Sequence, residues 1–247
     1  MDTVFRIFLK DLTTTPPVNP NDPLAGAMPD SSRYWGEGTR YVLGLGLKKW
    51  YDALCNPAAE PPEEGDPVAG DSMKTVIRGK GGAADVVDYP RSAYQSPRTM
   101  KPKAPYPKTP YTSADFWWDP TAANVTGTSL LLYCVRTPAD SVVVKRDPAM
   151  VSKLGGTGTT HRTGRGTISE LYVERMLTGG TIGQMQGLIN VAFHETMHNK
   201  LTAGNEMHAQ KGLAADTNFP GDTLTDANIR AMRAALDKPV IQDTQFL

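Results

Sequence analysis

The sequence predicts an α+β fold in which a small mixed or antiparallel sheet packs against one long helix. Short apolar runs rich in β-branched residues supply the strands. Residues 182–201 place apolar side chains at helical spacing, and many of the chain's 20 prolines fall within residues 56–120. The boundaries that follow are 1–127 for an N-terminal strand, a helix and the proline-rich region, and 128–247 for the main sheet and the long helix. Together they are expected to form one compact domain.

The N-terminal half begins with a strand over residues 4–12, followed by a helix over residues 33–54. Proline at the density of residues 56–120 blocks regular ladders and favours extended, polyproline-like backbone. We expect this region to be a long irregular loop that wraps the sheet, anchored by Trp117 and Trp118. The alternative is a segment that docks a recognition or delivery partner.

In the C-terminal half, residues 130–136 and 141–146 are two apolar runs separated by four turn-forming residues, which predicts a β-hairpin. Residues 155–166 are rich in glycine and threonine and are expected to be mobile. Apolar and polar residues alternate over residues 168–176, which predicts a strand directly before the long helix.

The long helix is the best-defined element. Thr181 and Gln184 have the spacing of a capping box, and Gly204 supplies a plausible stop. We therefore expect a helix over residues 182–201. A second helix is expected over residues 226–236, with Thr225 as its N-cap.

Composition narrows the function classes. The chain of 247 residues carries 26 Lys and Arg against 26 Asp and Glu, so it lacks the basic excess typical of nucleic-acid or membrane-surface binders. Cys55 and Cys134 form no CxxC pair and are expected to be buried thiols, with one disulfide as the alternative in an exported protein. The chain has neither a conventional signal peptide nor a membrane-spanning run, which favours a soluble protein, cytoplasmic or exported without a cleavable signal.

The long helix carries His194-Glu195-Thr196-Met197-His198, an HExxH motif. Residues four apart lie on one face of a helix, so both imidazoles can reach the same metal ion. Glu195 lies one step around the helix, where it can hydrogen-bond a metal-activated water and take its proton. The alternative is two structural histidines on an amphipathic helix, which would make the glutamate and the spacing accidental.

Residues 128–216 resemble the zincin superfamily of zinc metallopeptidases. The resemblance implies an HExxH helix, a downstream third ligand, and an edge strand above the helix that pairs with an extended peptide substrate. It further implies that His194 and His198 bind Zn²⁺ and that Glu195 is the catalytic general base. Tyr133 and Tyr172 are expected to be core residues, and His161 to be a solvated loop residue.

The third ligand departs from known zincin patterns. The metzincin pattern HExxHxxGxxH fails, because Leu201 stands three residues after His198 and Gly204 six. A helix one turn longer could still return the chain through Gly204 to His208. His208 is our first choice because imidazole is a favoured zinc ligand, followed by Asp216 and then Glu206.

These residues predict a zinc-dependent metallopeptidase acting on a protein or peptide substrate. Alternatives are a zinc amidase or other hydrolase, a delivered toxin-like effector whose residues 56–120 dock a partner, and a binding protein with a structural HExxH. A Glu195→Gln substitution separates the enzymes from the binding protein.

Overall fold

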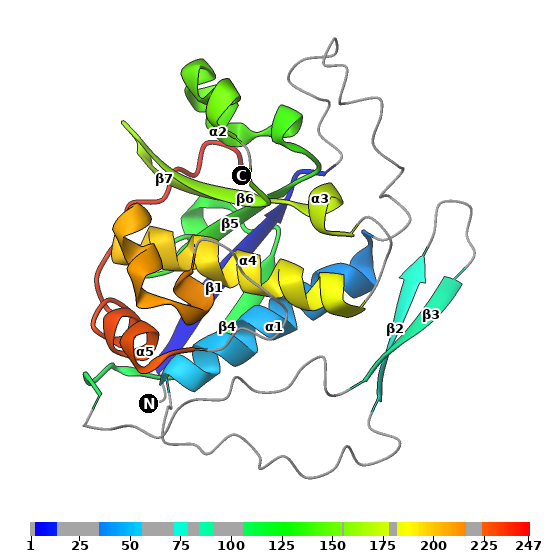
Figure 1. Cartoon of the computed structure of the whole chain (residues 1–247), viewed down its shortest axis with the longest axis horizontal. Coiled ribbons are helices and arrows are strands. Elements are labelled where there is room, and N and C mark those ends of the chain that lie inside the picture. Colours follow the sequence, from blue (N-terminus) through cyan, green and yellow to red (C-terminus); the bar gives the residue numbers. More distant parts are fainter. Residues whose placement is uncertain are drawn as a thin grey trace.

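A computed structural model describes most of the chain. The described residues are 3–13, 35–55, 72–78, 84–90, 106–154, 156–177, 182–215 and 224–247. The architecture is mixed α and β, as the sequence predicted, with a main five-stranded sheet and a separate two-stranded ribbon. Figure 1 shows the sheet behind the two longest helices.

The main sheet has the strand order β4-β1-β5-β7-β6. The strands β4 (Tyr111–Trp118), β1 (Thr3–Asp11), β5 (Leu130–Val135) and β7 (Gly166–Tyr172) pair in parallel, and β6 (Gly158–Thr163) joins β7 antiparallel at one end of the sheet. Since β1 lies between β4 and β5, strands from both sides of residue 127 share one sheet. The N-terminal strand expected over residues 4–12 is confirmed.

Both faces of the sheet are covered. Along β1, Phe5, Ile7 and Leu9 point into one core cluster and Phe8 into another, as the two-residue period of a strand requires. Every residue of β5 is buried, as is typical of a central parallel strand. One face is covered by α1 (Glu37–Cys55), α4 (Ile182–Leu201) and α5 (Asp226–Arg233), whose apolar residues join the first cluster. Short helical segments and the C-terminal residues cover the other face.

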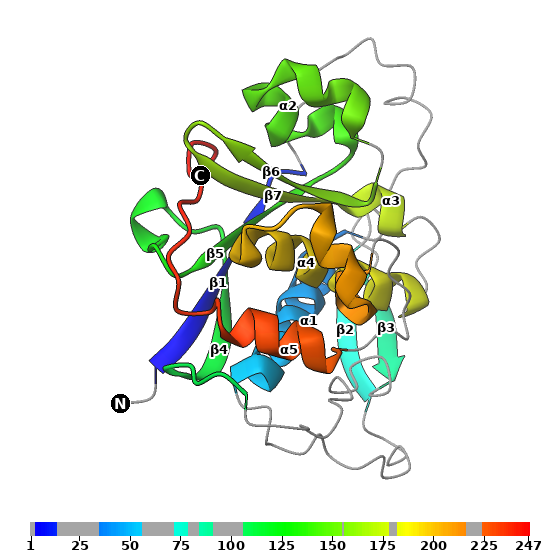
Figure 2. The ribbon, with the colours of Figure 1, turned by 60° about the vertical axis from the view of Figure 1, so that its left-hand side comes forward.

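The helix α1 begins four residues later than expected, and it retains two glycines that weaken intrinsic helix propensity. The two glycines allow close packing of α1 against its neighbours. A Cβ atom at Gly44 would lie 2.2 Å from the ring of Phe116 on β4, and one at Gly46 would lie 2.5 Å from Ile189 on α4. The glycines therefore let α1 lie directly against the sheet and against α4 (Figures 1 and 2).

The proline-rich region contains more regular structure than we expected. Strands β2 (Ser72–Arg78) and β3 (Ala84–Pro90) form the antiparallel ribbon, and β4 is a strand of the main sheet. The prediction rested on the number of prolines over a long window, which hides shorter proline-free runs long enough to form strands. The ribbon contains only Pro90, at a strand end, and β4 contains no proline. The other residues between 56 and 105 lie outside the described part of the chain.

The predicted hairpin over residues 130–146 is wrong. Its first half is β5, but its second half is the short helix α2 (Val142–Arg146). The Ser141 side chain accepts a hydrogen bond from the Val144 amide, and the buried carboxylate of Glu170 accepts one from the Val142 amide at 2.9 Å. Capping of the first helical turn by a residue from β7 thus overrides the β-propensity of three successive valines.

The next two segments also differ from expectation. The glycine- and threonine-rich stretch expected to be mobile forms β6, whose threonines pair with β7. The strand expected over residues 168–176 ends at Tyr172, and Val173 begins the short helix α3 (Val173–Leu177). The strand β7 is paired on both sides, and β6 lies beyond it at the edge of the sheet.

At the C-terminus, α5 begins at Asp226 with Thr225 as its N-cap, as expected, although it ends at Arg233.

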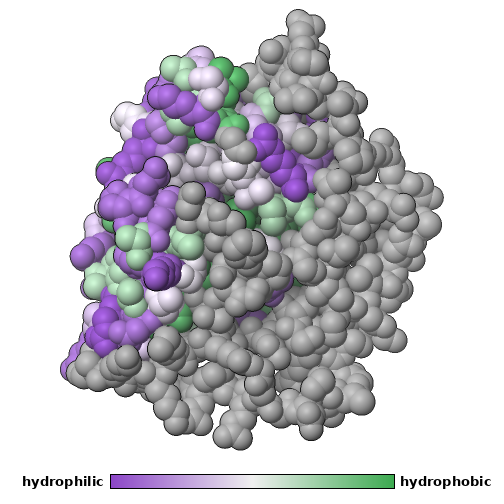
Figure 3. All heavy atoms as spheres, viewed as in Figure 1, coloured by the Kyte–Doolittle hydropathy of each residue, from purple (hydrophilic) through white to green (hydrophobic). Residues whose placement is uncertain are grey.

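Cys55 and Cys134 are buried free thiols, which confirms the sequence interpretation. None of the helices in the described part of the chain has the length and apolar character needed to cross a bilayer. In Figure 3, hydrophilic residues form much of the coloured surface.

Candidate metal centre

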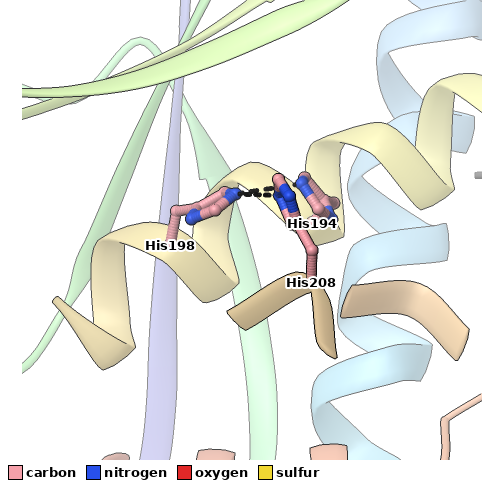
Figure 4. A group of neighbouring side chains, drawn as sticks. All are labelled: His194, His198 and His208. Atoms are coloured by element: carbon pink, nitrogen blue, oxygen red, sulfur yellow. Dashed lines mark hydrogen bonds between the residues drawn. The ribbon is translucent and has the colours of Figure 1, made fainter. Parts of the chain in front are cut away.

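Three of the chain's four histidines meet in one cluster (Figure 4). His194 and His198 come from α4, whose bounds match the prediction, and His208 comes from the 3₁₀ segment η6 (Asn205–Gln210). The Nε2 atom of His198 lies 3.0 Å from Nε2 of His194 and 3.1 Å from Nε2 of His208. All three ligand atoms lie within 4.8 Å of one another, close enough to hold one metal ion.

Backbone carbonyls determine the tautomers of the two helical histidines. His194 Nδ1 lies 2.9 Å from the carbonyl oxygen of Leu213, and His198 Nδ1 lies 3.0 Å from that of Ala203. A carbonyl oxygen only accepts, so each Nδ1 carries the proton, and each Nε2 of a neutral ring presents a lone pair. Two lone pairs then face each other across 3.0 Å, an arrangement that calls for a cation between them.

The donor set fits a transition metal. Ligating histidines commonly donate their second ring N–H to a backbone carbonyl, as both helical histidines do here. Two nitrogens bound tetrahedrally at about 2.0–2.1 Å from zinc would lie about 3.3 Å apart, close to the measured separations. A proton could bridge only one pair of rings at a time, whereas a single divalent ion could accept all three lone pairs.

The end of α4 brings the third histidine into place. Thr202 has a left-handed φ of 51°, the Ala203 amide donates to the His198 carbonyl, and the Thr202 amide donates to that of Asn199. This pattern is a Schellman motif with Thr202 at the C′ position. Gly204, the expected stop, is therefore not the residue that ends the helix. It lies two residues later, where the chain enters η6 toward His208.

Thr202→Gly is expected to stabilise the protein by about 1 kcal/mol, because a β-branched residue is strained at positive φ and glycine is not. For a chain of this size, that corresponds to an increase in Tm of about 2–4 °C. Differential scanning calorimetry of the metal-free protein measures the effect. Ala203→Gly is the matched control, since Ala203 has no positive φ and the change should lower Tm. Equal or lower stability of Thr202→Gly would contradict the assignment.

Glu195 points toward β6 at the sheet edge. The Thr160 hydroxyl lies 2.8 Å from Glu195 Oε2 and 2.8 Å from its backbone oxygen, so it can donate to either. A Cβ atom at Gly158 would lie 2.8 Å from Glu195 Cγ, so the absence of a side chain there makes room for the carboxylate. Burial raises the pKa of Glu195 to about 8, although the hydrogen bond from Thr160 acts in the opposite direction.

The other sequence candidates lie elsewhere or outside the described residues. Glu206 is exposed, and its Oε1 accepts from the Gly204 amide at 2.7 Å. This backbone hydrogen bond lowers the pKa of Glu206 and stabilises the start of η6. His161 lies on β6, 3.7 Å from Asp147, and is not part of the three-histidine group. Asp216 falls outside the described part of the chain.

Buried polar groups hold the C-terminal end of α4. Asn199 and Gln242 exchange two amide hydrogen bonds, at 3.0 and 2.9 Å, and Asn199 also donates to Ser169 on β7 at 2.9 Å. Lys200 Nζ donates to the carbonyls of Thr128 at 3.0 Å and Lys238 at 2.6 Å. Burial lowers the pKa of Lys200 to about 8. These contacts fix the turn of helix that carries His198.

Sequence reasoning found the three histidines and Glu195 but missed the groups that orient them. The carbonyls of Leu213 and Ala203 carry no sequence signal, because any residue supplies a carbonyl. Thr160 and Gly158 had a signal in the β-branched threonines of β6, in a stretch that we interpreted as a mobile loop. Tyr133 and Tyr172 are buried in the second core cluster, as expected.

Comparisons with known proteins add no family to this geometry. No family model, curated protein or solved structure matches the chain. Any functional assignment must therefore come from the site itself.

Proposed function

We propose that the chain is a zinc-dependent hydrolase of the zincin type that cleaves peptide bonds. The observation that carries the proposal is the convergence of His194, His198 and His208 through Nε2, with the two helical rings oriented by backbone carbonyls. Imidazole nitrogens suit zinc among the divalent metals, and a three-nitrogen set leaves a fourth position open for chemistry.

Each residue has a distinct role in this proposal. The three histidines would hold the ion, which when bound supplies a Lewis acid that polarises a carbonyl and brings the pKa of a water toward about 7. Glu195 would take a proton from the attacking water and pass it to the leaving nitrogen. The buried surroundings of its carboxylate, which favour the protonated form, suit a group that must both accept and release a proton near neutral pH.

The edge strand favours a peptide over a small amide. In the described residues, β6 pairs only with β7, so its other edge faces away from the sheet. Figure 2 shows β6 and β7 running across one side of α4. An extended peptide could add to such an edge through backbone hydrogen bonds, which a small amide lacks. The partner-docking alternative concerns residues 56–120, most of which lie outside the described part of the chain.

Elemental analysis of the purified protein tests the metal site. We expect about one zinc per chain in the wild type and loss of zinc in each of His194→Ala, His198→Ala and His208→Ala, because removing one donor from a three-histidine set lowers affinity sharply. His161→Ala is the matched control. It removes the one histidine outside the cluster and should retain zinc.

The outcomes separate the hypotheses. Absence of bound metal in a wild-type protein supplied with zinc would overturn the hydrolase proposal. Retention of zinc in His208→Ala alone would preserve the hydrolase but move the third ligand elsewhere, to Asp216 or Glu206.

A further inference from the structure

Residues on one side of β6 contact Glu195. Gly158 makes room for Glu195, and Thr160 hydrogen-bonds it. Alternate residues of a strand share a side, so Arg162 lies on this same side, two residues beyond Thr160. The residues between them serve the opposite side, where His161 lies 3.7 Å from Asp147.

Arg162 places a positive charge two residues along β6 from Thr160, which hydrogen-bonds Glu195. Its side chain is exposed, and it makes no ion pair or side-chain hydrogen bond with the described part of the chain. A guanidinium keeps its charge at any physiological pH.

We infer that Arg162 binds a carboxylate of the substrate, so that the site prefers peptides with an acidic side chain, or a free C-terminal carboxylate, next to the cleaved bond. The inference rests on the proposed hydrolase function. A planar guanidinium binds a carboxylate through two parallel hydrogen bonds, which fixes position as well as charge. A peptide paired along β6 would present alternate side chains on the side of Thr160 and Arg162, where Thr160 hydrogen-bonds Glu195.

The opposing interpretation is an ordinary solvated arginine, and the same hairpin offers the control. Arg165 is also exposed and positively charged, but it lies in the turn after β6, where its amide donates to the Thr163 hydroxyl at 3.1 Å. A purely long-range effect of positive charge should be similar for both arginines, whereas direct carboxylate binding should depend on Arg162 alone.

Cleavage of matched peptide pairs by the zinc-loaded protein tests the inference. One set compares Glu with Gln at each position around the cleaved bond, and a second compares a free C-terminus with its amide, which distinguishes the two sources of carboxylate. We expect the wild type to favour the carboxylate form in at least one set by about 10-fold or more in kcat/KM. Arg162→Gln should bring that ratio close to one, Arg162→Glu should invert it toward basic peptides, and Arg165→Gln should leave it unchanged.

Three results would overturn the inference in distinguishable ways. Cleavage by the wild type without carboxylate preference would overturn the inference and leave the proposed hydrolase intact. An equal loss of preference in Arg165→Gln would reduce the effect to general charge. Failure of the zinc-loaded wild type to cleave any peptide would remove the proposed peptidase and the inference with it. Tm and zinc content of each variant check that only recognition has changed.

Discussion

A Glu195→Gln variant is expected to lose hydrolytic activity about 10²–10⁴-fold while keeping its metal, because an amide cannot accept the proton of an attacking water. The exchange changes little else. Glutamine has nearly the same shape, and its amide oxygen can still accept the hydrogen bond that Thr160 donates to Oε2. The histidines contact one another and backbone carbonyls, and none of these contacts involves the Glu195 side chain.

Activity on a peptide mixture, zinc content and Tm should be measured together for this variant. Glu206→Gln is the control, because Glu206 is exposed and outside the three-histidine group, so this variant should keep both activity and zinc. If Glu195→Gln keeps more than a tenth of the wild-type rate, Glu195 is not the general base. If it loses zinc as well, the side chain contributes to the metal site, and the loss of activity no longer identifies its role.

The sequence predicted best the elements that carry a strong local pattern. The bounds of α4 followed from apolar residues at helical spacing, and Thr225 identified the start of α5 through a side chain that caps its own helix. His208 could be predicted for the same reason, because the short segment after α4 limits which downstream residues can reach His198. Such features depend on residues close in sequence.

The failures have a common physical cause, which is that distant residues decided the local structure. The three valines of α2 became helical because Glu170 on β7 holds the Val142 amide at 2.9 Å. The segment of β6 became a strand because β7 pairs with it. Window-based reasoning detects none of these long-range partners.

The order of strands in the sheet could not have been predicted from the sequence, and it matters for the site. The strand nearest in sequence to α4 is β7, but β7 is paired on both sides. Since β6 pairs antiparallel with β7 and forms the edge, the residues that contact the Glu195 side chain come from β6, and Thr160 lies 35 residues before Glu195.

Gly158→Ala tests that arrangement directly, and we expect it to impair stability and activity together. An added Cβ would lie 2.8 Å from Glu195 Cγ and 3.0 Å from the backbone oxygen of Glu170. The Glu170 oxygen belongs to the paired strand β7 and cannot move freely, so the main relief is a displacement of the Glu195 side chain. Overpacking of this kind costs about 1–3 kcal/mol, and displacement of a general base lowers kcat.

Gly164→Ala is the matched control, because a Cβ atom there meets nothing within 4 Å and the residue lies in the turn of the same hairpin. Thermal unfolding and peptide cleavage should be compared for the two variants, with zinc content as the check on the histidines. Loss of activity in Gly158→Ala with zinc retained would show that β6 controls the position of Glu195 independently of the metal. Full activity in Gly158→Ala would mean that the carboxylate works from another position, and β6 would lose its role in the catalytic proposal.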